Sequence, residues 1–259
     1  MRNTGICMRP KAMRTGKTEM DTVMTGQPEK RKLPENRTVP PGYRVPVLVY
    51  HGGGDVFDGE PVYFVHPKDM EEHIVHLRSL GYTYITFDDL PEIAQIEKPV
   101  IMTFDDGYAD NYYNLFPLLK KYRVKAVLSV ICDEIGTKGK LTARQIREMS
   151  DSGLVSVQSH TMTNQELDTM SEAKLEYELS ESKRRIGLLT EKEPSVICYP
   201  MGRCSASVLR CAERYYSYGI AGTGDCFVTG RNPYEIERFF MYRGLAAEAL
   251  GNRISGYES

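Results

Sequence analysis

Short apolar runs alternate with longer segments of helical periodicity between residues 44 and 240. A short apolar run predicts a buried strand, and apolar residues at i, i+4 and i+7 predict an amphipathic helix. This pattern predicts strands at residues 45–50, 82–87, 99–102, 125–132, 154–157, 195–199, 218–221 and 235–240. It predicts helices that begin near residues 67, 88, 111, 142, 171 and 205, with Asp88 and Thr142 as caps and Pro117 as a kink.

The regular alternation of strands and helices indicates right-handed βαβ units around a parallel sheet. We therefore expect an α/β fold, a deformed (β/α)7-8 barrel with parallel strands. A doubly wound open sheet is the alternative, although the chain has no glycine-rich dinucleotide fingerprint. In a parallel barrel, catalytic residues gather at the carboxyl ends of the strands. Four expected strands end in residues suited to chemistry or to shaping a loop: His51, Asp105-Asp106, Ser159-His160 and Tyr199-Pro200.

Residues 1–43 differ in composition from the rest of the chain. Basic residues outnumber acidic ones there and apolar residues are few, which predicts a disordered basic N-terminal arm before a catalytic domain at residues 44–259. The arm has no apolar core of a secretory signal peptide, and no run approaches the roughly 18 apolar residues of a membrane span. The sequence alone therefore predicts a cytoplasmic protein. Its net charge of -2 gives no reason to expect nucleic acid or a membrane surface as a partner.

The six cysteines form no CxxC pair, which argues against a thiolate zinc site or a thioredoxin-like motif. Cys132 and Cys198 lie in apolar runs, where we expect them to pack as small hydrophobic residues. Six reduced thiols are typical of a reducing compartment.

Asp105 and Asp106 follow an apolar strand, where an unpaired charge is costly to bury. Their alternative role is to form the turn that Gly107 completes. Side chains that are adjacent on a strand point in opposite directions, so we expect the two carboxylates to have unequal roles. One would bind a divalent metal, and the other would act as the general base beside a metal-bound water.

His160 and Asn164 are four residues apart, so one helical turn would aim both side chains at a common point. An imidazole nitrogen and an amide oxygen can both bind a divalent metal. With one carboxylate from the Asp pair they would form an open three-ligand site. The alternative is a hydrogen-bonded histidine followed by a helix-capping asparagine.

The segment 103–108 resembles the first motif of the polysaccharide deacetylase family, also called the NodB homology domain or carbohydrate esterase family 4. Segment 159–164 is similar to the second motif of the family, and segment 199–202 is similar to the third. Arg238 resembles the arginine of a late motif. The resemblance spans about residues 44–245. It implies a metal-dependent hydrolase that acts on carbon–nitrogen bonds other than peptide bonds and removes N-acetyl groups from amino sugars or polysaccharides. Zinc is the expected metal, with cobalt or nickel as alternatives, and an N-acetylated carbohydrate is the expected partner.

The resemblance also implies a role for each matching residue. Asp105 is the general base and Arg238 orients it, while the backbone amide of Met201 stabilises the oxyanion. The implied metal ligands are Asp106, His160 and Asn164, and the implied substrate contacts are Tyr108, Tyr199 and Pro200.

Two departures from the family pattern affect these expectations. Family members usually have histidine where this chain has Asn164, so we expect weaker or different metal selectivity. Many members also use a late histidine as general acid, but none follows His160 here. We therefore expect His51 to be the acid, as in the branch that deacetylates exported poly-N-acetylglucosamine. That branch has a permuted motif order. Members of the family as a whole often work at the cell envelope.

Two other functions compete with deacetylation. Because Asn164 replaces a histidine, the barrel could bind sugar with weak or lost activity. The segment 51–54 matches the oxyanion loop of some serine esterases. That mechanism needs a Gly-x-Ser-x-Gly nucleophile and a late histidine, and the chain has neither. The sequence does not indicate an oligomeric state.

Overall fold

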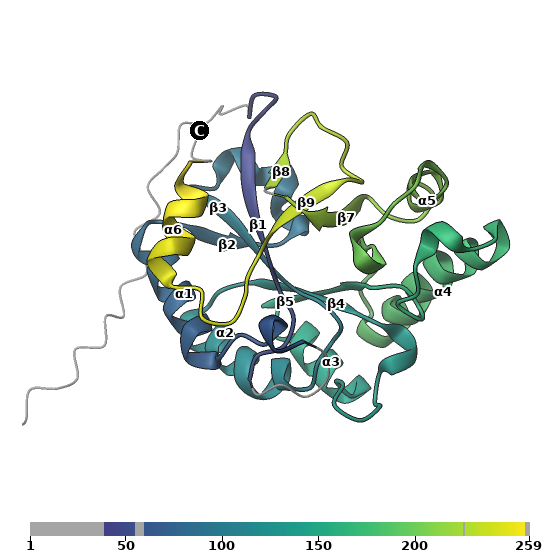
Figure 1. Cartoon of the computed structure of the whole chain (residues 1–259), viewed down its shortest axis with the longest axis horizontal. Coiled ribbons are helices and arrows are strands. Elements are labelled where there is room, and N and C mark those ends of the chain that lie inside the picture. The colour runs from purple at the N-terminus through teal and green to yellow at the C-terminus, as the bar shows by residue number, and fades with distance from the viewer. Residues whose placement is uncertain (1–38, 55–59, 225, 257–259) are drawn as a thin grey trace, which may run out of the picture. The chain divides into compact units, whose positions relative to one another are not determined.

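A closed ring of seven parallel strands forms the centre of the molecule (Figure 1). The computed structural model describes residues 39–54, 60–224 and 226–256. Around the ring the strands are β3 (Pro99–Phe104), β4 (Ala126–Val130), β5 (Val155–Ser159), β6 (Val196–Cys198), β7 (Tyr218–Thr223), β9 (Ile236–Phe240) and β1 (Arg44–Tyr50). β1 pairs with both β9 and β3, which closes the ring. The predicted barrel is therefore confirmed, and the open sheet is not formed.

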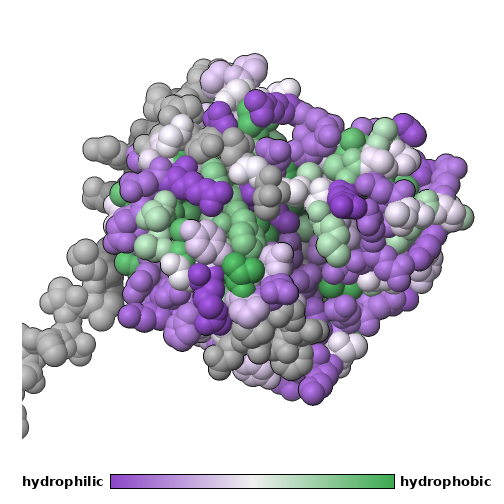
Figure 2. Space-filling model, viewed as in Figure 1, coloured by the Kyte–Doolittle hydropathy of each residue, from purple (hydrophilic) through white to green (hydrophobic). Residues whose placement is uncertain are grey.

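Two short strands extend this ring. β2 (Thr83–Ile85) pairs in parallel with β3, and β8 (Cys226–Val228) pairs antiparallel with β1. The helices lie on the outside of the strands (Figure 1): α1 (Pro67–Ser79), α2 (Phe116–Tyr122), α3 (Ala143–Asp151), α4 (Glu172–Thr190), α5 (Ala206–Ala212) and α6 (Ala247–Ser255). On the face seen in Figure 2, hydrophobic residues are exposed in small patches among hydrophilic ones.

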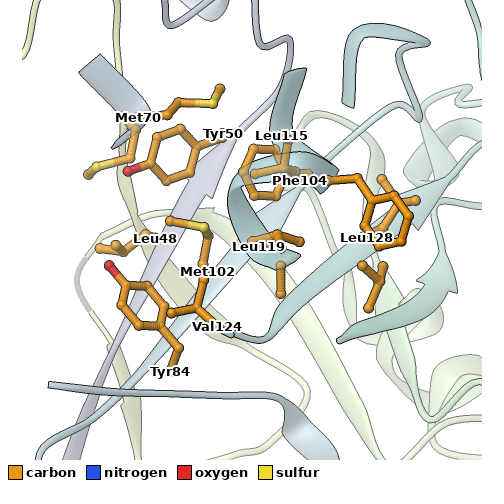
Figure 3. Packing of buried hydrophobic residues seen from close by; sticks show 14 of the residues in the cluster. Leu48, Tyr50, Met70, Tyr84, Met102, Phe104, Leu115, Leu119, Val124 and Leu128 are labelled. Carbon is orange, nitrogen blue, oxygen red and sulfur yellow. The ribbon is translucent and has the colours of Figure 1, made fainter. Parts of the chain in front are cut away.

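The buried hydrophobic residues form three clusters, and alternating side chains of one strand belong to different clusters. On β1, Val45 and Val47 point into the barrel, whereas Leu48 and Tyr50 pack against the surrounding helices. The outer core continues along β3, where Tyr50 stacks on Phe104 with ring centres 5.0 Å apart (Figure 3). Because successive side chains of a strand point to opposite faces, one strand contributes to the barrel interior and to the layer beneath the helices. This is expected for parallel sheets covered by helices.

Several helix boundaries differ from the predicted ones. Thr86, not Asp88, caps the short helix η2 (Phe87–Gln95). The Thr86 backbone N–H donates a hydrogen bond to Asp89 Oδ2 at 2.8 Å. The predicted helix from residue 111 begins as one π-helical turn, η3 (Asn111–Leu115), before Pro117 enters α2. Proline has no N–H to donate, so it fits the first turn of a helix better than the interior. The predicted cap Thr142 is confirmed, with Gln145 as its reciprocal partner.

β8 and α6 were not predicted from the sequence. β8 has only three residues, too few for a periodic signal. α6 packs against α1 and buries Leu250 and Ile254. The predicted N-terminal arm lies outside the described residues except for residues 39–43.

Candidate active site

The inward-facing side of two strands changes from apolar to polar toward the carboxyl end. On β3, Ile101 belongs to the interior core, and Thr103 and Asp105 follow at a spacing of two residues. On β9 the same spacing leads from Ile236 to Arg238. Because side chains alternate between the two faces of a strand, this periodicity places the polar groups inside the mouth of the barrel.

A cavity of about 580 Å³ opens at this mouth, within the usual size range for small-molecule sites. All but one of the residues predicted for the site line it: His51, Asp105, Asp106, Tyr108, His160, Asn164, Tyr199, Met201 and Arg238. Pro200, the exception, is buried at the start of the short helix η6 (Pro200–Gly202).

Asp105 and Arg238 form a buried two-point ion pair. Arg238 Nη1 donates to Asp105 Oδ1 at 2.9 Å, and Nη2 donates to Oδ2 at 2.8 Å. Nη1 also donates to Thr103 Oγ1 at 3.0 Å. Burial on its own would raise the pKa of Asp105, but the Arg238 charge and hydrogen bonds hold that pKa well below its usual range. Asp105 is therefore ionised and fixed in orientation.

Asp106 adopts a left-handed backbone conformation with φ 69°. β3 ends at Phe104, so strand alternation does not extend to Asp106, and both carboxylates line the same cavity. The expectation that they point in opposite directions is wrong for this reason. Aspartate tolerates a left-handed backbone better than most residues do. The surroundings of the two carboxylates nevertheless differ, since Asp105 faces Arg238 and Asp106 faces His160.

His160 is buried between a carbonyl and a carboxylate. Its Nδ1 lies 2.9 Å from the Cys198 carbonyl oxygen, and its Nε2 lies 3.4 Å from Asp106 Oδ1. Burial alone would lower the pKa of His160. Electrostatic interactions with Cys198 and Asp106 outweigh burial and raise that pKa above its usual value.

The donor set around His160 fits a divalent metal. A carbonyl partner requires the hydrogen on Nδ1, so Nε2 of a neutral imidazole directs a lone pair toward Asp106. Two electron-rich atoms at this distance need a positive charge between them, either a proton or a metal ion. Asn164 lines the same cavity, and its side chain carries an amide oxygen that could serve as a further ligand. A nitrogen and two oxygens, with the imidazole oriented by a carbonyl, are typical metal ligands.

A second grouping brings together Asp105, His160 and Cys198, whose ligand atoms all lie within 4.8 Å of one another. Both oxygens of Asp105 already accept bonds from Arg238, and Cys198 Sγ lies 3.5 Å from Asp105 Oδ2. Asp105 is therefore less open to a cation than Asp106.

The loop from His160 to Asn164 is not the helical turn that the spacing predicts. Thr161 and Asn164 have left-handed φ values of 64° and 56°. The buried Glu178 of α4 holds the loop, since its Oε2 accepts the backbone N–H groups of Met162 at 2.9 Å and of Thr163 at 3.0 Å. Its Oε1 accepts the Thr163 hydroxyl at 2.7 Å. These bonds fix a conformation that local sequence does not favour.

His51 occupies the cavity wall just beyond β1. Its ring lies 4.7 Å from the Tyr63 ring and 6.2 Å from the Phe240 ring, measured between centres. Its Nδ1 is buried without a hydrogen-bond partner among the described residues. Burial lowers the pKa of His51, although Asp105 and Asp106 act in the opposite direction. A buried polar atom without a partner is uncommon and marks a position for a bound group.

Met201 lies at the cavity rim with its side chain 74% exposed. Its backbone is left-handed, with φ 56°, a conformation that costs a non-glycine residue roughly 1–2 kcal/mol. Tyr199, two residues earlier, is buried, and its hydroxyl lacks a partner within the described part of the chain. Strained backbone of this kind is often found at functional sites.

Comparison with known proteins gives three consistent results. A family model described as Polysaccharide deacetylase matches residues 92–218. YxkH of Bacillus subtilis (strain 168), which carries a provisional polysaccharide deacetylase name, is 31% identical over 214 residues, covering 80% of this chain and 75% of YxkH. The chain belongs to the polysaccharide deacetylase family. The crystal structure of BC0361, a polysaccharide deacetylase from Bacillus cereus, is similar with a TM-score of 0.77 and 32% identity, covering 82% of this chain and 69% of BC0361.

A more distant member of the polysaccharide deacetylase family is the poly-beta-1,6-N-acetyl-D-glucosamine N-deacetylase of Staphylococcus aureus (strain MSSA476). It is 23% identical over 197 residues, covering 69% of this chain and 68% of the relative.

Sequence reasoning missed several residues of this polysaccharide deacetylase site. Cys198 was predicted only to pack, but its Sγ contacts both Asp105 and Arg238. Thr103 could have been found, because it shares the inward face with Asp105. The sequence pattern did not indicate a role for Glu178, because Met162 and Thr163, the loop residues that it binds, lie 16 and 15 residues earlier.

The serine esterase alternative is not supported by the loop after β1. The Gly53 N–H donates to Asp110 Oδ2 at 2.9 Å, so it is not free to bind an oxyanion. Among the described residues, no helix is long and apolar enough to cross a membrane.

Proposed function

We propose that this chain is a metal-dependent hydrolase that removes N-acetyl groups from acetylated amino sugars or polysaccharides. The observation that carries the proposal is the pairing of two unlike carboxylates in one cavity. Asp105 is held by Arg238, and Asp106 faces His160. Membership in the polysaccharide deacetylase family supports the same reaction. The name of the staphylococcal relative supports an N-acetylated carbohydrate as the substrate class.

In this proposal, Asp106, His160 and Asn164 hold the metal, with zinc favoured and cobalt or nickel as alternatives. When bound, such a metal polarises a carbonyl and lowers the pKa of water toward neutrality. The Cys198 carbonyl keeps Nδ1 of His160 protonated, so that Nε2 is the nitrogen that faces the cavity.

Asp105 acts as the general base that accepts a proton from the attacking water. Arg238 keeps one orientation of the carboxylate, because both of its Nη atoms are bonded to it. His51 donates a proton to the departing amine, and its ring lines the cavity beside Asp105 and Asp106. The Met201 backbone N–H stabilises the developing oxyanion, and Tyr108 and Tyr199 line the substrate pocket. Pro200 is buried, so it supports the pocket from behind and does not contact the substrate as the resemblance implies.

Acetate release from a panel of N-acetylated glycans, with added zinc, cobalt or nickel, tests this function. Replacing a general acid or base typically lowers the rate by roughly 10²- to 10⁴-fold, so we expect losses in this range for D105N and H51N. His66→Asn is the matched control, because His66 is exposed and caps α1 away from the cavity. Equal loss of activity in H51N and H66N would contradict the role of His51.

Metal binding is measured separately by calorimetry on the purified chain. His160→Ala is expected to abolish stoichiometric binding, whereas H66N is expected to retain it. Glycan binding without acetate release under any metal would overturn the proposal in favour of a sugar-binding barrel.

A further inference from the structure

A row of aromatic rings leads out of the cavity. The ring of Tyr63 lies 4.7 Å from that of His51 and 5.3 Å from that of Phe240, and Phe240 lies 6.4 Å from Tyr242. His51, Tyr63 and Phe240 line the cavity, whereas Tyr242 lies beyond its lining. The row therefore starts beside the proposed catalytic groups and continues onto the surface.

The two outer tyrosines remain accessible. Tyr63 and Tyr242 are each 38% exposed. Single exposed aromatic residues are common and need no functional explanation. Here three aromatic side chains form a continuous series that joins a cavity, which is the arrangement expected of a binding surface.

Arg243 fixes the two segments that carry the row. Its backbone N–H donates to the Val62 carbonyl at 3.1 Å, and its Nη2 donates to the Gly54 carbonyl at 2.8 Å. Val62 precedes Tyr63, and Arg243 follows Tyr242. The hydrogen bond from the Arg243 N–H to the Val62 carbonyl therefore joins the two segments next to these tyrosines. The later segment is the connection from β9 to α6 in Figure 1. A preformed surface of this kind costs less ordering free energy on binding than a flexible one.

We propose that Tyr63, Phe240 and Tyr242 bind the sugar unit next to the one that loses its acetyl group, so that the preferred substrate is an oligosaccharide or polymer. This inference rests on the proposed function. The C–H face of a pyranose ring is apolar and flat, and it can lie against an aromatic ring while its hydroxyls stay in water. Tyr242 lies outside the cavity lining, so a ligand that contacts both the catalytic groups and Tyr242 must extend beyond one sugar.

The test compares kcat/KM for N-acetylglucosamine, its β-linked oligomers of increasing length and a small acetyl ester. Tyr242→Ala is the main variant, because Tyr242 is outside the cavity lining and its removal should leave the catalytic groups in place. We expect Y242A to lower kcat/KM for the longer oligomers by roughly tenfold, the scale of losing one ring-stacking partner, mainly through KM. Activity on the monosaccharide and the ester should be unchanged.

Tyr242→Phe keeps the ring and should behave like the wild-type protein. Tyr177→Ala is the matched control, since Tyr177 is 50% exposed on α4. If the wild type turns over short and long substrates equally, or if Y242A affects all substrates alike, the subsite is wrong while the hydrolase function stands. If the wild type releases acetate from none of them, the proposed function itself fails. Calorimetric binding of a deacetylated oligomer then tests the aromatic row alone, with tenfold weaker binding to Y242A expected.

Discussion

Replacing Glu178 should destabilise the protein and weaken metal binding at the proposed site together. Glu178 is 1% exposed on α4, and it accepts three hydrogen bonds from the loop between His160 and Asn164. Glu178→Ala would leave the N–H groups of Met162 and Thr163 without this acceptor. A buried donor that loses its partner costs about 1–3 kcal/mol, so the two amides together cost about 2–6 kcal/mol. This is a large share of the roughly 5–15 kcal/mol that stabilises a typical protein.

Glu178→Gln is the informative comparison. One amide oxygen can replace Oε2 and accept both backbone N–H groups. The amide nitrogen can replace Oε1 and donate to the Thr163 hydroxyl. We therefore expect the Gln variant to lose only about 1 kcal/mol, the difference between charged and neutral hydrogen bonds.

Urea unfolding of the metal-free protein measures the stability of each variant, and zinc calorimetry measures the metal site. Zinc affinity should fall in the Ala variant and remain close to the wild-type value in the Gln variant. Glu172→Ala, an exposed residue of the same helix, controls for the loss of an α4 carboxylate. If E178A unfolds within 0.5 kcal/mol of the wild type and binds zinc equally well, the loop is not held by Glu178 and the reasoning is refuted; this threshold is about the usual size of a surface substitution.

Three further predictions follow from other side chains. Arg238→Met should cost about 3–5 kcal/mol in urea unfolding, because it leaves the Asp105 carboxylate buried without its partner, and D105N in the same chain should recover part of that loss. Asn164→His should tighten zinc binding in calorimetry, since imidazole is a better zinc ligand than an amide oxygen, and an unchanged affinity would place residue 164 outside the metal site. Burial lowers the pKa of His73, so its stabilising contribution is present above about pH 6.5 and is lost as the pH falls toward the lowered pKa. The stability difference between wild type and His73→Gln in urea unfolding should therefore shrink between pH 7.5 and 5.

The parts of the site that strands carry could be predicted from the sequence, because strand periodicity determines the facing of each side chain. Asp105 and Arg238 lie on the same inward face as Ile101 and Ile236. The position of Asp105 at a strand end was enough to place it at the barrel mouth, whereas Arg238 lies within β9 and was assigned from the family resemblance.

The parts that loops carry could not be predicted, because their conformations depend on distant contacts. Asp106, Thr161 and Asn164 have left-handed backbones, which no periodic pattern signals. The bonds from Glu178 reach the loop from another element of the fold. The four-residue spacing predicted a helical turn that would bring His160 and Asn164 together. Both residues do line one cavity, but a non-helical loop brings them there.

The charges at the barrel mouth explain why two adjacent carboxylates can differ in role. Arg238 neutralises Asp105, so the pair contributes no net charge to the cavity. Asp106 remains as the unbalanced anion, and His160 is the nearest group that can respond to it, at 3.4 Å. Electrostatic interactions with Cys198 and Asp106 raise the pKa of His160 despite its burial. In the proposed function, a divalent cation between His160 and Asp106 would balance the charge of Asp106. Because Arg238 occupies both oxygens of Asp105, a cation in the proposed site would bind Asp106 rather than Asp105.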